Sequence, residues 1–263
     1  MKGYTGTLAS GEAIHYVDRK RWFWLMSVLY PLQPFIGIAL HAATGNEWWL
    51  LLPVLLNYGV APLIDMVLGE DTNNPPEAVL MQLDRDTYYR RLTYIVVPLH
   101  FITLFGTAWY AAAADLSAWG ILGLAIVAGM TAGLAINTGH ELGHKNSKLE
   151  KLLAKIVLAL PAYGHFTIDH NRGHHRDVST PEDVASARMG ESIYGFARRE
   201  YPGAFRRAWA IEKDRLSLRG KSAWHPSNQI LQSYALTAVI WLALVMAFGW
   251  IMLPFLLVHS LLA

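Results

Sequence analysis

The sequence contains no cysteine and little charge, since Asp, Glu, Lys and Arg make up only 16% of its 263 residues. In typical soluble domains these four residue types make up about 25% of the chain. Without cysteine there is no disulfide, no thiolate metal site and no cysteine nucleophile, so any metal must bind to His, Asp or Glu. The 22 basic and 20 acidic residues nearly balance, which argues against a nucleic-acid partner.

Apolar residues take the place of the missing charge. Hydrophobic residues make up 53% of the chain, with 10 Trp and 12 Tyr, the ring types that gather at membrane interfaces. Five apolar runs reach the roughly 20 residues that a bilayer core requires. They cover residues 22–43, 48–68, 92–114, 119–137 and 230–250, and a partial sixth run starts at Leu253. We therefore expect an all-α polytopic membrane protein that forms one domain over residues 1–263.

The basic residues predict the orientation of these helices. Every Lys and Arg lies within residues 2–21, 85–91 or 145–221, and the positive-inside rule places such segments in the cytoplasm. We expect an inner-membrane protein with a cytoplasmic N-terminus and a cytoplasmic helical insert at residues 145–229. Within this insert, the pattern predicts a membrane-surface helix at Leu149–Leu160 and a polar helix at Glu191–Arg219.

Two histidine clusters, both expected at the cytoplasmic edge of the membrane, are the candidate metal-binding residues. The fourth apolar run continues into a His-Glu-Leu-Gly-His stretch that contains His140 and His144, whose four-residue spacing places both rings on one helix face. A second cluster contains His170 and His174 at the same spacing, followed by His175. Ligation by nitrogen alone suits iron, zinc, copper or nickel. Five histidines exceed one zinc site and indicate two metals.

Two other functions share part of this pattern. Residues 140–144 also read as the HExxH motif of a zinc peptidase, in which Glu141 would be the general base. A peptidase would have no use for all three histidines of the second cluster. A non-enzymatic metal carrier is the other alternative, but the clustered histidines lie at one membrane edge and no ionisable path crosses the bilayer.

Longer stretches around the histidines resemble one family. The run HELGHK, the run YGHFTIDHNRGHHRDVSTPEDVASARMGESIY and the loop GEDTNNPPE resemble the membrane-bound alkane hydroxylases of the integral-membrane fatty-acid desaturase and hydroxylase superfamily. The resemblance implies a non-haem di-iron centre, O₂ activation and hydroxylation of the terminal carbon of a medium-chain alkane, with electrons from rubredoxin. Acyl lipids are the alternative substrates. The five matching histidines, as iron ligands, are His140, His144, His170, His174 and His175.

The chain departs from that family in two respects. Asp169 stands where the family usually has Glu, which keeps the carboxylate but shortens it by one methylene. Two later motifs, an Asn-Tyr-x-Glu-His-Tyr-Gly stretch and a His-x-x-His-His box that supply further ligands, are absent. The run from Leu253 has 11 residues and would cover about 16 Å of a core roughly 30 Å thick. We therefore expect a C-terminally incomplete chain that binds metal weakly and does not turn over alone.

Other residues are candidates for catalytic, hydrogen-bonding, substrate-channel and docking roles. Glu141 and Asp169 are the catalytic candidates, and His165 is expected to form a hydrogen bond and not to bind metal. The resemblance places Asn57, just before Tyr58-Gly59, where the family often has a bulky residue. Asn57 is therefore expected either to line the substrate channel or to bond a neighbouring helix. A basic face for an acidic electron carrier or anionic lipid is expected from Arg198, Arg199, Arg206, Arg207, Lys213, Arg215, Arg219 and Lys221.

Overall fold

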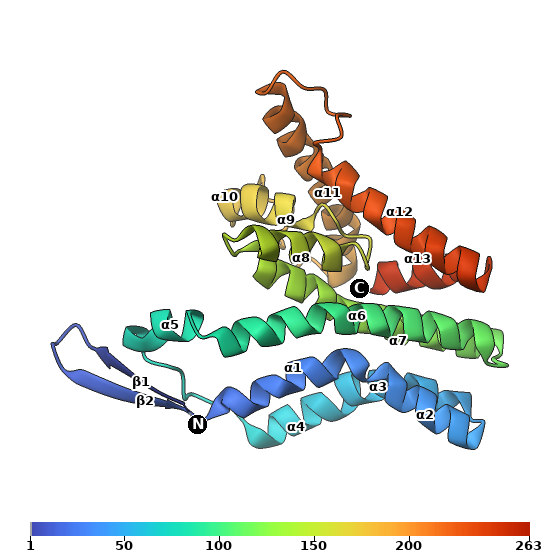
Figure 1. The fold of residues 1–263 in the computed structure, drawn as a ribbon, viewed down its shortest axis with the longest axis horizontal. Coiled ribbons are helices and arrows are strands. Elements are labelled where there is room, and N and C mark those ends of the chain that lie inside the picture. The colour runs from blue at the N-terminus through green and yellow to red at the C-terminus, as the bar shows by residue number, and fades with distance from the viewer. Residues whose placement is uncertain (1) are drawn as a thin grey trace. The chain divides into compact units, whose positions relative to one another are not determined.

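The computed structural model describes residues 2–263. It divides into two compact units, residues 1–131 and 132–263, and the boundary falls inside the long helix α7 (Ala118–Gly143). Figure 1 shows that almost every element is a helix. The prediction of a mostly helical protein is therefore confirmed.

The first unit begins with a β-hairpin that the all-α prediction missed. Strand β1 (Lys2–Thr7) pairs antiparallel with β2 (Ala13–Asp18), with Lys2 opposite Asp18 (Figure 1). The strands are short and mostly exposed, so only a weak alternation of apolar and polar residues marks them in the sequence. Tyr4 is the buried residue of β1, and its side chain ties the hairpin to the helices that follow.

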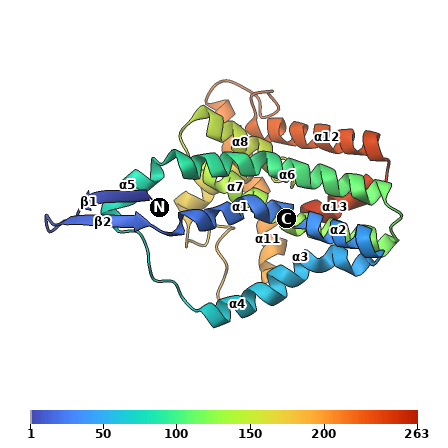
Figure 2. The same cartoon turned by 60° about the horizontal axis from the view of Figure 1, so that its bottom comes forward.

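Apolar helices form the rest of the first unit. The chain bends by 52° between residues 20–32 and α2 (Pro34–Thr44). The Pro31 carbonyl, near this bend, accepts a hydrogen bond of 2.6 Å from the Thr103 hydroxyl. Helix α2 packs against the start of the next apolar segment and against α6 (Figure 2). The other elements are η1 (Lys20–Leu25), α1 (Met26–Leu29), η2 (Tyr30–Leu32), η3 (Glu47–Leu51), α3 (Leu52–Leu55), η4 (Leu56–Val60), α4 (Ala61–Leu68), α5 (Glu77–Asp84) and α6 (Thr87–Ala113).

The second unit carries the polar insert and the last apolar helices. After the end of α7 come α8 (Lys148–Leu158), α9 (Phe166–Asp169), η5 (His170–His174), α10 (His175–Asp177), α11 (Ile193–Ser217), α12 (Gln229–Phe248) and α13 (Met252–Leu262). Side-chain caps fix where three of these helices begin: Ser147 caps α8, Ser192 caps α11 and Asn228 caps α12. Both helices expected in the insert are present, at residues 148–158 and 193–217.

The core of the second unit holds the short helix α9 in place. Ile168 of α9 packs with Ala208 of α11 and Ile230 of α12, and all three side chains are buried. Since Ile168 lies two residues before His170, this contact fixes the start of the second histidine cluster.

Among residues 2–263, four helices are long and apolar enough to cross a membrane, or five if the bent pair forms one span. These helices cover residues 47–68, 87–113, 118–143 and 229–248, with the bent pair at 20–44. They overlap the five runs expected from hydropathy. The helix at 252–262 is shorter than a span.

Candidate metal centre

The first histidine pair lies at the end of α7. His140 and His144 project from the same face, and their Nε2 atoms lie 2.9 Å apart. The four-residue spacing therefore brings these two rings together, as expected. The carboxylate of Glu141 lies 3.5 Å from the other ring nitrogen of His140, and its side chain is largely exposed.

The second histidine cluster does not follow the geometry of an α-helix. Residues 170–174 form a π-helical turn, η5, in which the backbone N–H of His175 donates to the carbonyl of His170. Such a turn closes over five residues instead of four. It brings His175 beside His170, with their Nε2 atoms 3.0 Å apart, while the ring of His174 stacks on His170 with 5.4 Å between ring centres.

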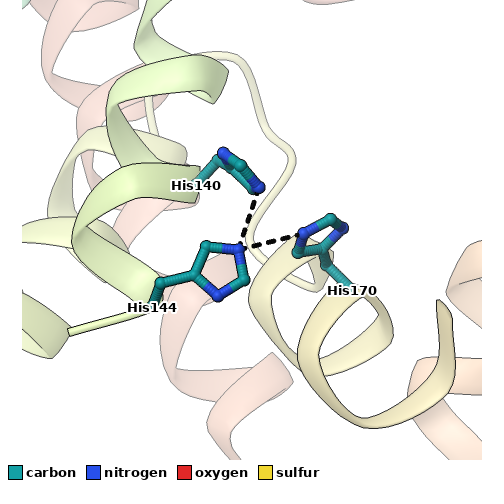
Figure 3. A group of neighbouring side chains, drawn as sticks. All are labelled: His140, His144 and His170. Carbon is teal, nitrogen blue, oxygen red and sulfur yellow. Dashed lines mark hydrogen bonds between the residues drawn. The ribbon is translucent and has the colours of Figure 1, made fainter. Parts of the chain in front are cut away.

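The two clusters meet at His170. Its Nε2 atom lies 3.2 Å from Nε2 of His144, so four histidines form a continuous series of facing nitrogens. Ligand atoms of His140, His144 and His170 all lie within 4.8 Å of one another, and Figure 3 shows these three rings turned toward a common point from two separate helical segments. The structure thus brings together residues that are 30 positions apart.

These nitrogens fit a metal ion. Two imidazole nitrogens that each lie about 2.1 Å from one metal, at right angles, are about 3.0 Å apart, close to the separations found here. Burial and the neighbouring histidines lower the pKa of His170 to about 4, and burial lowers the pKa of His144 below its usual value. Near neutral pH these rings are therefore uncharged and offer lone pairs, as metal ligation requires.

His174 is oriented by a carboxylate that the sequence reasoning missed. Its Nδ1 atom lies 2.8 Å from Oδ2 of Asp183. Burial opposes ionisation of Asp183, but hydrogen bonds from Ser186, Arg207 and His174 outweigh it and hold the pKa of Asp183 well below its usual range. An ionised carboxylate only accepts, so the His174 proton resides on Nδ1 and leaves Nε2 free to ligate, the arrangement common around metal-bound histidines. Asp183 lies nine residues after His174, a separation that no metal-site spacing rule identifies.

Asp169 is buried directly before the second cluster, and its partner is Arg207. The guanidinium binds both carboxylate oxygens, at 2.6 and 2.8 Å. Both catalytic candidates, Asp169 and Glu141, thus lie beside the histidines, and a catalytic role for either remains a prediction.

Two other expected side chains form hydrogen bonds. His165 is buried and its Nδ1 lies 2.9 Å from the Tyr234 hydroxyl, so the hydrogen-bonding role is confirmed. In the first unit, Asn57 lies in the π-helical turn η4 and donates to Gln33 Oε1 at 2.8 Å and to the Pro53 carbonyl at 2.7 Å. This bond to the preceding apolar segment fits the alternative role considered for Asn57, and a role in the substrate channel stays a prediction.

The expected basic face is smaller than the sequence indicates. Three of its members are engaged in ion pairs within the insert: Arg199 with Glu191, Arg207 with Asp169 and Asp183, and Arg215 with Glu212. Sequence position alone does not distinguish them from their neighbours. The exposed cations that remain are Arg198, Arg206, Lys213, Arg219 and Lys221.

Comparisons with known proteins identify relatives of this chain. The chain is 52% identical to alkane 1-monooxygenase 1 of Alcanivorax borkumensis over 92% of its own length and 60% of that protein. It is 50% identical to the alkane 1-monooxygenase of Pseudomonas putida, over 97% of the chain and 63% of that protein, and to that of Ectopseudomonas oleovorans, over 93% and 61%. The chain therefore spans about three-fifths of the length of these relatives, and the resemblance seen in the sequence is confirmed.

A family model extends the comparison to the insert and the last helices. The model for fatty acid desaturases matches residues 116–263, which include α7 and all five clustered histidines. This match covers more than half of the chain. The chain belongs to the fatty acid desaturase family.

Proposed function

We propose that this chain provides the membrane-embedded metal centre of a non-haem di-iron monooxygenase that hydroxylates the terminal carbon of medium-chain alkanes, using O₂ and electrons from rubredoxin. The observation that carries the proposal is the convergence of Nε2 atoms from His140, His144 and His170, with His175 Nε2 3.0 Å from that of His170. Identity of 50–52% to alkane 1-monooxygenases supports the choice of reaction.

The residues of the chain would hold and orient the metal. Iron bound to these histidines would supply the activation of O₂. His140, His144, His170, His174 and His175 are the proposed ligands. Asp183 keeps the proton of His174 on Nδ1, and Glu141 lies close enough to His140 Nδ1 to orient that ring. In the metal-free chain, the lowered pKa of His170 leaves this ring neutral and ready to bind.

An apolar substrate suits a site at the end of membrane helices. An alkane has no polar group to recognise, so its binding free energy must come from burial of apolar surface, at about 25 cal/mol per Å². Selection of the terminal carbon then depends on the length of the channel that admits the chain. Asn57, in an apolar helix of the first unit, is the proposed length-determining residue.

The distribution of charge supports an orientation and a partner. The positive-inside rule places residues 145–229 and the histidines on the cytoplasmic side of an inner membrane. The five exposed cations of α11 and the segment after it give this insert a basic surface. An acidic rubredoxin-type donor would be steered toward it by long-range attraction.

One alternative substrate class has support of its own. The matching family model is that of fatty acid desaturases, so an acyl lipid could take the place of the alkane above the same metal. A zinc peptidase is less consistent with the site, because one zinc and three ligands would leave the facing nitrogens of His170 and His175 unexplained.

Metal identity on the purified protein is the primary test. We expect iron to be the metal bound. In a version of the protein that also carries the two later histidine motifs, we expect membranes supplied with NADH, rubredoxin reductase and rubredoxin to form 1-octanol from octane. A His170→Ala variant serves as the control for both measurements. Retention of one zinc per chain, together with oxidation of neither octane nor an acyl lipid, would refute the proposal. Oxidation of an acyl lipid alone would select the alternative.

A further inference from the structure

Arg207 of α11 lies between two buried carboxylates that flank the second histidine cluster. Its Nε and Nη2 atoms donate to Asp169, at 2.6 and 2.8 Å, and its Nη1 atom donates to Asp183 Oδ1 at 2.8 Å. The Arg207 side chain is only 12% exposed. All three nitrogens of the guanidinium are thus occupied, and one cation joins segments that are 38 and 24 residues away.

The same guanidinium packs on the backbone of the π-helical turn. Gly173 is buried within that turn, and a Cβ atom placed on it would lie 2.6 Å from Arg207 Nε. Real Cβ atoms essentially never approach other heavy atoms this closely. A side chain at position 173 would therefore displace either the turn or the arginine, and glycine allows the two to pack together. Arg207 therefore lies against the turn that brings His175 to His170.

Asp183 connects Arg207 to the ring of His174. Its Oδ2 atom accepts from Ser186 Oγ at 2.6 Å and lies 2.8 Å from His174 Nδ1, while Oδ1 accepts from Arg207 and from the Ala185 backbone N–H at 3.1 Å. Both oxygens are therefore committed. Arg207 is thus one of three groups that hold Asp183 in place, and Asp183 in turn contacts His174.

We propose that Arg207 is a positioning residue for the metal centre. It binds Asp169 and Asp183 and packs against the Cα of Gly173, and these contacts hold the π-helical turn in the conformation that brings His175 beside His170. Through Asp183 it also keeps the proton of His174 on Nδ1, so that the Nε2 lone pair is available. The inference rests on the proposed function, because it concerns the metal that these histidines would bind. It assigns Arg207 no contact with substrate or metal.

The conservative variant Arg207→Lys separates positioning from simple charge balance. A lysine keeps the positive charge but has a single nitrogen, so it cannot bind Asp169 at two points and Asp183 at the same time. Arg206→Lys is the matched control, because Arg206 is the next residue of the same helix and is exposed. Co²⁺ is the probe, since its visible absorption bands report the number and geometry of its ligands.

The experiment measures Co²⁺ binding and the His174 tautomer in the full chain in detergent. We expect Arg207→Lys to weaken Co²⁺ binding by about 10- to 100-fold, the usual effect of losing a residue that orients metal ligands, and to change the cobalt spectrum. In ¹⁵N-histidine spectra, with His174 assigned through His174→Gln, the Nδ1–H form should lose population. Arg206→Lys should match the unaltered protein in every measurement. Unchanged cobalt affinity and tautomer in Arg207→Lys would overturn the proposal.

A second variant keeps the proposal testable if Arg207→Lys does not fold. Gly173→Ala retains every charge but places a methyl group against the guanidinium, so it should also weaken Co²⁺ binding and shift the tautomer. Its control is Gly195→Ala in α11, where an added Cβ would meet only ordinary contacts of 3.5 Å or more. Normal cobalt binding and tautomer in Gly173→Ala would refute the role of Arg207. If the unaltered protein binds no Co²⁺, the metal-centre proposal fails, and the tautomer spectra alone decide on Arg207.

Discussion

His170 and His175 are five residues apart in the chain, yet their Nε2 atoms lie only 3.0 Å apart. On a regular α-helix, residues five apart point in directions that differ by about 140°. The π-helical turn at residues 170–174 removes this difference. Single π-helical turns inside helices are frequent at functional sites, and here the turn adds a fourth nitrogen to the three that converge.

The first prediction concerns the central place of His170. Its Nε2 atom faces both His144 and His175, so His170→Ala should reduce Co²⁺ or Fe²⁺ affinity by at least about 10-fold, and by more than His174→Ala does. Isothermal titration of each variant measures the difference. His15→Ala, on the exposed hairpin strand β2, should bind metal normally. Equal losses from the His170 and His174 variants would contradict the central position of His170.

The second prediction concerns Glu141. Its exposed carboxylate lies 3.5 Å from His140 Nδ1 and is not among the proposed metal ligands, so Glu141→Gln should retain most of the bound metal, with affinity reduced by less than about 10-fold. Metal content and cobalt spectra measure this effect. In a zinc peptidase, the same change would remove the general base and leave a metal-loaded but inactive protein. Casein hydrolysis that disappears in Glu141→Gln would favour the peptidase instead.

The third prediction concerns chain length. Asn57→Trp removes the hydrogen bond to Gln33 and adds a large ring to the apolar helix, so a channel past this residue would become shorter. In a preparation that turns over alkanes, the variant should shift preference from dodecane toward octane. Gln33→Ala is the control, because it breaks the same bond without adding bulk. An unchanged octane-to-dodecane ratio in Asn57→Trp would exclude Asn57 from the channel.

The fourth prediction concerns the pH dependence of stability at the start of α6. A hydrogen bond from Arg21, at 2.6 Å, holds the pKa of Asp86 well below its usual range, and bonds from Tyr4 and Lys2 add to this effect. Because the folded pKa is lower than the unfolded pKa, ionised Asp86 stabilises the fold above about pH 4, and this contribution is lost as the pH falls further. Asp86→Asn should therefore lower the free energy of unfolding by about 3 kcal/mol at pH 7.

Thermal unfolding at several pH values checks that prediction. The difference between Asp86→Asn and the unaltered protein should shrink as the pH falls from 4 to 2. Asp71→Asn removes an exposed carboxylate that pairs with Lys20 and should change stability little at any pH. A difference for Asp86→Asn that stays constant down to pH 2 would show that the charge of Asp86 is not the cause.

The sequence predicts the parts of this structure that depend on composition and local spacing. Apolar runs mark the membrane-type helices because each must reach a minimum length, and the four-residue spacing of His140 and His144 predicts one shared face, as observed. The hairpin at residues 2–18 was missed, since its two strands are too short and exposed to give a clear period-two pattern.

Other features depend on contacts that no local pattern reveals. His170 and His174 have the four-residue spacing of an ordinary α-helix, yet residues 170–174 form a π-helical turn. This turn packs against Arg207 at Gly173, a contact that the local sequence does not reveal. Asp183 acquires its role from a contact with His174, nine residues earlier. Arg207 has the same sequence context as the exposed Arg206, so its burial between two carboxylates follows from the packing of α11 and not from its neighbours in the chain.

The bond between Arg207 and Asp169 also sets an order of events during biosynthesis. The ribosome makes Asp169 38 residues before the arginine that neutralises this carboxylate, and the second histidine cluster follows Asp169 directly. Until α11 has emerged and docked, Asp169 and Asp183 have no cation at these positions and are stable only in contact with water. The contacts of Arg207 with this cluster therefore form only after α11 has been synthesised, and a metal ion delivered earlier would meet histidines that these contacts do not yet hold.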